Sequence, residues 1–314
     1  MLPPRTPEQV DIADRTPDSV DAATMDRIRR GCSNAVRAFL LLFMLLLGLS
    51  SVVEATGIDF AKSASAALDR GDWDEAIGLY GQAIGAGDLS KENLAIVHYD
   101  RGIAYSRKGE VDKAITDYNA AIQLLPEYVE AYHGRATAYR DKELTEKAIA
   151  DYDAAIRFAP DDAFAYENRG RAFLHVGKVD AAINDMAKAV SLAPTDSYAV
   201  LWLHLAHRSA KQDDSAEFSQ NVAKLDHVEW PAPVLDLFLG KTDPQAVQVA
   251  AAAAPDPKKQ REQTCEADFY VGAYELFRGA SAEAKQLFKA TVETCPSYFL
   301  EAEAARAELK RLGP

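Results

Sequence analysis

Apolar and small side chains recur along this chain with a period of 34 residues. Three prolines mark the period, because Pro126, Pro160 and Pro194 each close the same pattern. In the middle copy the pattern consists of aromatic, small and charged residues, namely Tyr132, Arg135, Ala136, Tyr139, Ala148, Tyr152 and Pro160. A self-similar period of this length is typical of stacked helix-turn-helix repeats. The sequence therefore predicts an all-α fold built from antiparallel helix pairs.

The three full copies of the pattern occupy residues 95–128, 129–162 and 163–196. Small residues at Gly102, Ala136 and Gly170 mark the point where the two helices of each copy are expected to touch most closely. Only small residues allow two helix backbones to approach in this way, while larger rings fill the space around the contact.

The pattern continues on both sides of this block. A copy at 57–94, in register but with four extra residues in its loop, precedes it, so residues 56–196 are predicted to hold four repeats, and a fifth repeat lies at 265–298. The interval 197–264 is two periods long and is predicted to contain two degenerate helical hairpins.

Residues 299–314 are predicted to form one more helix, with apolar side chains on one face. The opposite face carries the charged residues Glu301, Glu303, Glu308 and Arg311 and is expected to face solvent. We therefore expect a helix that caps the end of a repeat array.

The repeat pattern resembles that of the tetratricopeptide repeat (TPR) family. The resemblance implies a TPR solenoid in which the first helices of successive repeats line a concave groove for a protein or peptide. Carried onto this sequence, the groove positions are Tyr99, Arg107, Glu130, His133, Arg140, Glu167, Arg171 and His175. Aromatic and Arg side chains are good anchors in protein interfaces, and Arg140 and Arg171 are expected to face solvent. Ordinary solvated helix positions are the competing interpretation of each residue.

Beyond the repeats, the second half resembles the NlpI family of bacterial envelope TPR lipoproteins. The residues that carry the resemblance are Leu201, Trp202, Leu203, Leu205, Ala206, Trp230, Leu237, Leu239, Gly240, Glu266, Phe269, Tyr270, Gly272, Glu308 and Leu309. The resemblance implies a periplasmic scaffold that docks proteases and peptidoglycan hydrolases, often as a homodimer. The chain departs from the family because no Cys follows its apolar amino-terminal run. A TPR subunit of an envelope secretion or assembly machine is the alternative function.

The amino terminus has the features of an export signal. Residues 38–53 form a run of 16 uncharged, mostly apolar residues behind several arginines, and a small-x-small pattern ends at Ala55. This pattern predicts cleavage after Ala55, with 1–55 as leader and signal peptide and the repeats in the periplasm. An uncleaved anchor that tethers the repeats to the inner membrane is the alternative. Residues 1–24 lack the basic start of a signal, so the true start at Met1 or Met25 stays open.

The net charge bears on the class of partner, and the cysteine content bears on the cellular compartment. The formal net charge of −13 at pH 7 is spread along the repeats. Nucleic acid is not an expected partner, because binding it requires a basic face.

Two cysteines, Cys265 and Cys295, remain outside the signal. Cys265 is placed at the first residue of a helix and Cys295 at the end of its antiparallel partner. We expect a disulfide between them, as in an oxidising compartment; two packed thiols are the alternative.

Charged residues also recur with the repeat period. Arg101, Arg135 and Arg169 occupy equivalent positions, and the chain has an Asp 16 residues after each of them. The first and last copies lack both partners, so we expect the two side chains to interact. Two independent solvated charges are the alternative.

Signals for catalysis are sparse. The sequence has no glycine-rich phosphate loop, no nucleophile elbow and no Cys-x-x-Cys motif. His204 and His207 share a helix face and could bind a metal together, with Asp213 and Asp214 nearby, which makes a metal-dependent enzyme the second alternative function. We expect a non-catalytic protein without a cofactor.

Overall fold

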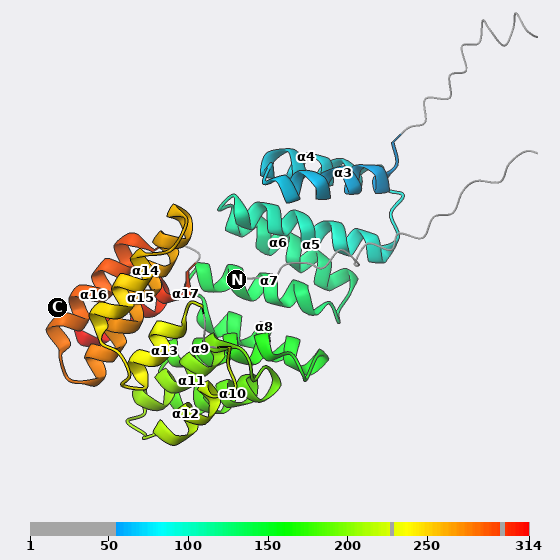
Figure 1. The fold of residues 1–314 in the computed structure, drawn as a ribbon. Helices are drawn as coiled ribbons and strands as arrows, with labels where there is room; N and C mark the ends of the chain where they lie inside the picture. Colours follow the sequence, from blue (N-terminus) through cyan, green and yellow to red (C-terminus); the bar gives the residue numbers. More distant parts are fainter. Residues whose placement is uncertain (1–54, 227–228, 296–298, 314) are drawn as a thin grey trace, which may run out of the picture. The chain divides into compact units, whose positions relative to one another are not determined.

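The computed structural model describes residues 55–226, 229–295 and 299–313. Within these ranges the chain forms helices and no strand, which confirms the all-α prediction (Figure 1). Residues 1–54 of the predicted leader, with the apolar run and both candidate start residues, lie outside the described ranges. No helix of the described segments combines the length and the apolar character needed to span a bilayer.

The first eight described helices form four consecutive pairs, in which each helix packs on the next. These helices are α3 (Gly57–Arg70), α4 (Trp73–Ala86), α5 (Lys91–Arg107), α6 (Val111–Leu124), α7 (Val129–Asp141), α8 (Thr145–Phe158), α9 (Ala163–His175) and α10 (Val179–Leu192). The first helices of neighbouring pairs also meet, as α3 does with α5 and α5 with α7. This tandem packing is that of a solenoid.

The turn inside each pair places one residue in the left-handed backbone region. Glycine takes this position in three pairs, with φ of 81° at Gly71, 81° at Gly109 and 76° at Gly177. Glycine adopts this conformation without a steric penalty, because it has no Cβ atom. Glu143 and Lys211 hold the equivalent position in two other turns, each with φ of 58°.

Each repeat buries one large side chain from its second helix. Tyr80, Tyr118, Tyr152 and Met186 occupy equivalent positions and are almost fully buried. Glycine makes room for these residues. A Cβ atom at Gly102 would lie 2.7 Å from the Tyr118 ring, and one at Gly170 would lie 2.9 Å from Met186. Small residues therefore mark the close helix contacts, as predicted.

The recurring charges form paired side chains within each repeat. Arg135 donates through Nε and Nη2 to the two carboxylate oxygens of Asp151, at 2.8 and 2.6 Å. The equivalent two-bond pairs join Arg101 to Asp117 and Arg169 to Asp185. The prediction that these residues interact is confirmed, and the alternative of independent solvated charges is wrong.

The arginines also link successive repeats. Arg135 donates through Nη1 to Asn119 of the preceding repeat at 2.5 Å. Arg169 makes the same bond to Asp153 at 2.6 Å. Each of these two guanidinium groups thus connects three helices: its own, the second helix of its repeat and the second helix of the repeat before.

The remaining helices are less regular. They are α11 (Ser197–Ser209), α12 (Ser215–Val222), α13 (Ala232–Phe238), α14 (Pro244–Ala252), α15 (Pro257–Phe277), α16 (Ser281–Thr294) and α17 (Leu300–Leu312). The largest apolar cluster of the described residues lies here, around Leu201, Leu235, Tyr270 and Phe288. The second half and the fourth repeat, through Met186 and Val190, therefore share one core, whereas the first three repeats have smaller clusters.

Helix α15 begins earlier than the sequence indicated. Asp256 caps it by accepting from the backbone N–H groups of Lys258 and Lys259, and Pro257 takes the first helical position. Such a cap followed by proline fixes a helix start. Cys265 consequently lies in the third turn of α15, and its placement at the first residue of the helix is wrong.

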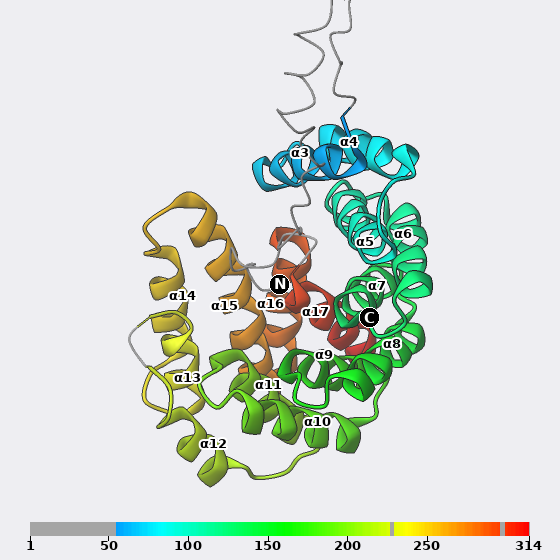
Figure 2. The same ribbon diagram turned by 90° about the vertical axis from the view of Figure 1, so that its right-hand side faces the viewer.

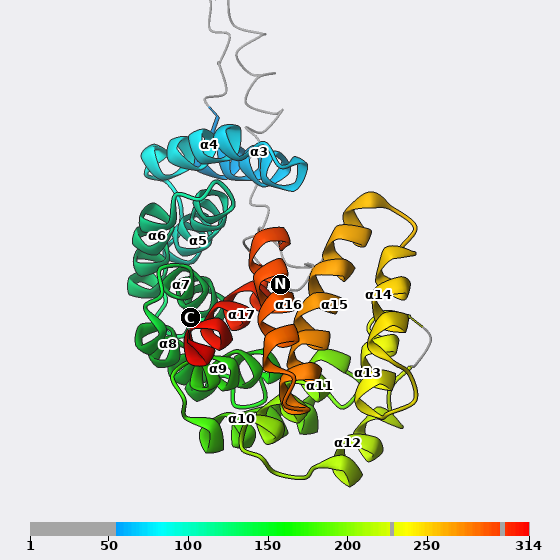
Figure 3. The same ribbon diagram turned by 90° about the vertical axis from the view of Figure 1, so that its left-hand side faces the viewer.

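Helix α17 packs on α15 and α16. Figures 2 and 3 show it beside α7 and α9, the first helices of two repeats, rather than only at the end of the array. Glu301 is 6% exposed, so its predicted place on a solvent-facing side is wrong. The face of α17 that was expected to meet water is instead partly turned inward.

Candidate partner-binding groove

The eight residues predicted to line a groove lie on α5, α7 and α9, the first helices of three repeats. Arg107 and Glu130 have exposed side chains. The other six are either buried inside the repeats or paired with neighbours. They fall into two groups, a structural group and a basic row.

Tyr99, His133 and Glu167 form the structural group, each less than a tenth exposed. Tyr99 packs against the rings of Tyr118 and Tyr128. His133 Nε2 lies 2.6 Å from the carboxylate of Asp162, the residue that caps α9. The prediction that these three side chains present themselves to a partner is wrong, because the close packing of successive repeats covers them.

Arg140, Arg171 and His175 form the second group, which we call the basic row. Arg140 Nε lies 3.1 Å from a carboxylate oxygen of Glu303 on α17, and His175 Nδ1 lies 3.7 Å from the other. The side chains of Arg140 and Arg171 are only 16% and 15% exposed. The expectation that these two arginines face solvent is therefore wrong, since α17 covers this part of the repeats.

Two opposite effects act on the pKa of Glu303. Burial raises the pKa of its carboxyl, while the charges of Arg140 and His175 act to lower that pKa. The sequence missed this residue because the amphipathic pattern of α17 placed it on the solvent side. Local periodicity does not predict where a helix that is distant in sequence packs against the repeats.

Arg171 is fixed from two sides. Its Nη2 lies 2.6 Å from Glu167 one turn earlier on α9, and its guanidinium stands over the ring of Trp202 at 5.4 Å. Burial raises the pKa of Glu167, and Arg171 counters that effect. Such stacking of a guanidinium on an indole adds to the ion pair and makes the arginine rigid.

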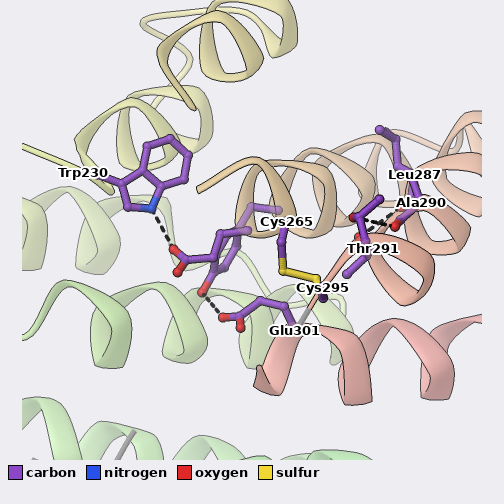
Figure 4. Close-up of a disulfide and its surroundings, with 10 residues drawn as sticks. Trp230, Cys265, Leu287, Ala290, Thr291, Cys295 and Glu301 are labelled. Carbon is purple, nitrogen blue, oxygen red and sulfur yellow. Dashed lines mark hydrogen bonds between the residues drawn. A yellow bond between two sulfur atoms is a disulfide. The ribbon is translucent and has the colours of Figure 1, made fainter. Parts of the chain in front are cut away.

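Two buried acidic residues, Glu266 and Glu301, lie close enough for their charges to interact. Figure 4 shows Glu301 near the two cysteines. Glu266 accepts from Trp230 Nε1 at 2.7 Å and from the Tyr198 hydroxyl at 2.8 Å. Tyr270 donates to Glu301 at 3.4 Å. Burial and the nearby charge of Glu301 together raise the pKa of Glu266 to about 7, against the lowering effect of the hydrogen bonds from Trp230 and Tyr198. We call Glu266 and Glu301 the acid pair.

Cys265 and Cys295 form a disulfide with their Cα atoms 5.1 Å apart, as predicted. The bond joins α15 to the end of α16, immediately before the segment that leads to α17. It lies next to the acid pair, since Glu266 follows Cys265 in the chain (Figure 4).

His204 and His207 do not share a common site. His204 Nδ1 lies 2.8 Å from Asp214, and its ring stacks on Phe218 inside the core. His207 Nδ1 lies 2.8 Å from Gln212. Across the described ranges, no three His, Cys, Asp or Glu side chains gather closely enough to hold a metal ion. Both histidines act in local packing and hydrogen bonding.

Comparisons with known proteins agree with this architecture. The profile of the tetratricopeptide repeat family matches residues 62–129, 99–163 and 133–197. The crystal structure of a tetratricopeptide repeat protein from Parabacteroides merdae ATCC 43184 is similar over 80% of this chain and 98% of its own, with a TM-score of 0.55 and 16% identity. A structure of MamA from Desulfovibrio magneticus RS-1 covers 54% of this chain and 92% of its own, with a TM-score of 0.47 and 22% identity. At these identities the structural likeness concerns the fold alone.

Proposed function

Because residues 62–197 are tetratricopeptide repeats, we propose that this chain is a non-catalytic scaffold of the bacterial cell envelope. Its partners are proteins or peptides, of which the proteases and peptidoglycan hydrolases implied by the NlpI resemblance are the first candidates. The repeats supply a surface, and the recurring Arg–Asp pairs of the described repeats are engaged with each other rather than arranged for proton transfer.

The basic row carries this proposal. Arg140 and His175, from the first helices of two successive repeats, converge on the carboxylate of Glu303 on α17. A groove that accepts an acidic residue of the chain's own helix has the chemistry to accept an acidic segment of a partner. The exposed Arg107, one repeat earlier, extends the same basic character away from α17.

Capture of envelope proteins tests the proposal. Arg107→Glu reverses a charge on the groove side of α5 and should reduce the amount of cross-linked partner, because an acidic ligand then meets a like charge. Lys113→Glu on α6 is the matched control, since Lys113 is also exposed but lies on a second helix. Arg107 is a better position for this test than Arg140, because Arg140→Glu would place a second carboxylate beside Glu303. Equal capture by both variants would contradict a groove-based scaffold.

We further propose that the chain is exported and that the mature protein begins at Thr56. Thr56 already acts as the amino-terminal cap of α3, because it exchanges hydrogen bonds with Asp59. Its backbone nitrogen lies 2.9 Å from the Asp59 carboxylate, so a new ammonium group there would keep an acidic partner. Amino-terminal sequencing of protein from the envelope checks this. Recovery of residues 38–53 in the purified chain would instead indicate a membrane anchor.

A further inference from the structure

A cavity of about 190 Å³ lies between α9, α11, α15 and α17. Its walls are largely apolar and include Leu174, Leu205, Phe269, Phe277, Phe288 and Ala304. An apolar cavity of about 150 Å³ in a protein core is large enough to bind benzene. This cavity could therefore hold an apolar group of the size of a phenyl ring or somewhat larger.

Two polar N–H groups of the cavity lining have no acceptor among the described residues. One is the indole Nε1 of Trp202, whose side chain is nearly buried at 4% exposure. The other is Nε of Arg171. Buried donors are almost always paired in folded proteins, so two unpaired ones in a single cavity point to a missing acceptor.

The two donors are held in fixed positions. Arg171 stacks on Trp202 and is tied through its Nη2 to Glu167, which leaves its Nε free to donate elsewhere. Trp202 also packs on Phe269, with ring centroids 5.6 Å apart. A ligand would therefore meet a preformed site with little loss of side-chain freedom.

We propose that this cavity binds an apolar ligand that carries a carboxylate. The carboxylate accepts hydrogen bonds from Trp202 Nε1 and Arg171 Nε, and the apolar body fills the space between α11, α15 and α17. A carboxylate suits the site better than a neutral carbonyl, because one of the two donors of the site belongs to the cationic Arg171. A free organic acid and the terminal residue of a polypeptide share this chemistry. The cavity shares Arg171 with the basic row, and Arg140 and Glu303 also line it. Ligand binding is measured without a protein partner, so a failure to bind the ligand is distinguishable from a failure to capture proteins.

Calorimetric titration of the whole mature chain tests the ligand class. The probes are 4-phenylbutyrate and its amide, together with an acetylated tripeptide that ends in phenylalanine, as free acid and as amide. We expect the acids to bind at least 10-fold more tightly than the matching amides, the ratio that one hydrogen bond to a charged group supports. Binding of phenylbutyrate alone identifies a small-molecule site, and binding of the peptide acid identifies a chain terminus. Equal affinity of acid and amide, or no binding by any probe, overturns the proposal.

Three variants assign the contacts. Trp202→Phe keeps a ring but removes the donor, and it should weaken binding of the acid by about 10-fold. Trp73→Phe on α4 makes the same change far along the chain and should leave affinity unaltered. Ala304→Phe fills the cavity from α17 and should abolish binding. Thermal melting of each variant verifies the fold, and unchanged binding in Trp202→Phe together with Ala304→Phe would show that the cavity is not the site.

Discussion

The Arg–Asp pairs show how the pKa of an aspartate can differ between equivalent positions of two repeats. Burial acts to raise the pKa of both Asp117 and Asp151. At Asp117 the hydrogen bonds from Arg101 and His98 outweigh burial, so the pKa is lowered. At Asp151 only Arg135 opposes burial, and the pKa is raised. The extra partner His98, 2.8 Å from Asp117, accounts for the difference.

A double-mutant cycle on Arg135 and Asp151 should give a clear coupling energy. Both side chains are largely buried, at 18% and 7% exposure, and a hydrogen bond to a charged group is worth about 1.5–3 kcal/mol. Either single substitution to alanine leaves a charge without its partner, so the double variant should be less destabilised than the sum of the two. Urea denaturation measures all four free energies of unfolding. The exposed pair Arg70 and Asp72 is the control and should show additive effects.

Glu143 and Lys211 carry a conformational penalty that glycine would remove. Their φ of 58° costs a residue with a Cβ atom about 1–2 kcal/mol. Glu143→Gly should therefore raise the free energy of unfolding by about 0.5–1 kcal/mol, after the greater flexibility of glycine in the unfolded chain is subtracted. The reverse change, Gly109→Ala, should destabilise the chain, although no neighbouring atom lies within 4 Å of the new Cβ. A lower melting temperature for Glu143→Gly would contradict the argument.

These residues also show what the sequence could predict. The 34-residue period predicted the paired charges and the close contacts at glycine, because both depend on helices that are neighbours in the chain. It could not place Tyr99 or His133, whose burial depends on how tightly the next repeat packs. The unpaired donor of Trp202 has no sequence signal, since it arises where four separate helices meet.

At the scale of elements, α17 is tied to the rest of the molecule by Glu301 of the acid pair and by Glu303, and the disulfide fixes the end of α16 that precedes it. Its apolar spacing predicted a helix, and the structure has one at Leu300–Leu312. Its docking beside α7 and α9 was not predictable, because a terminal helix can lie on several apolar surfaces with the same amphipathic pattern.

Reduction of the disulfide should loosen α17 more than any repeat of the first half. Closing a loop between residues 30 apart contributes about 3–4 kcal/mol through the entropy of the unfolded chain. Hydrogen exchange with and without reductant measures the effect, which we expect in the last turns of α16 and in α17. The variant with both cysteines changed to alanine should match the reduced protein. Uniform loss of protection in α5–α10 would show that the bond does not act locally.

At the scale of the whole molecule, the acid pair links stability to pH. The pKa of Glu266 is about 7 in the folded chain and near 4.5 when exposed. A carboxyl whose folded pKa is raised stabilises the fold fully below the unfolded value, and this contribution is lost as pH rises through the folded value. The groups that face Glu266 are Glu301, Glu262, the Tyr198 hydroxyl and the Trp230 indole.

We therefore expect the free energy of unfolding to fall between pH 4.5 and pH 7, by roughly 2–4 kcal/mol from this group. Glu266→Gln should flatten the curve over that window, because an amide does not ionise. Glu130→Gln, at an exposed position of α7, should leave the curve unchanged. Denaturant titrations at several pH values compare the three proteins. An unaltered slope in Glu266→Gln would exclude this residue as the source.

The links made by Arg135 and Arg169 have a consequence for the length of the array. Each of these arginines binds an acceptor in its own repeat and another in the repeat before it, at Asn119 or Asp153. A second copy of residues 129–162 inserted after the first would bring an Arg135 equivalent beside Asp153, and its own Asp153 equivalent would then receive Arg169. Each added repeat thus supplies both an arginine and the acceptor for the arginine of the next repeat. A chain can therefore gain or lose a repeat of this kind by duplication or deletion while every such guanidinium group keeps an acceptor in the preceding repeat.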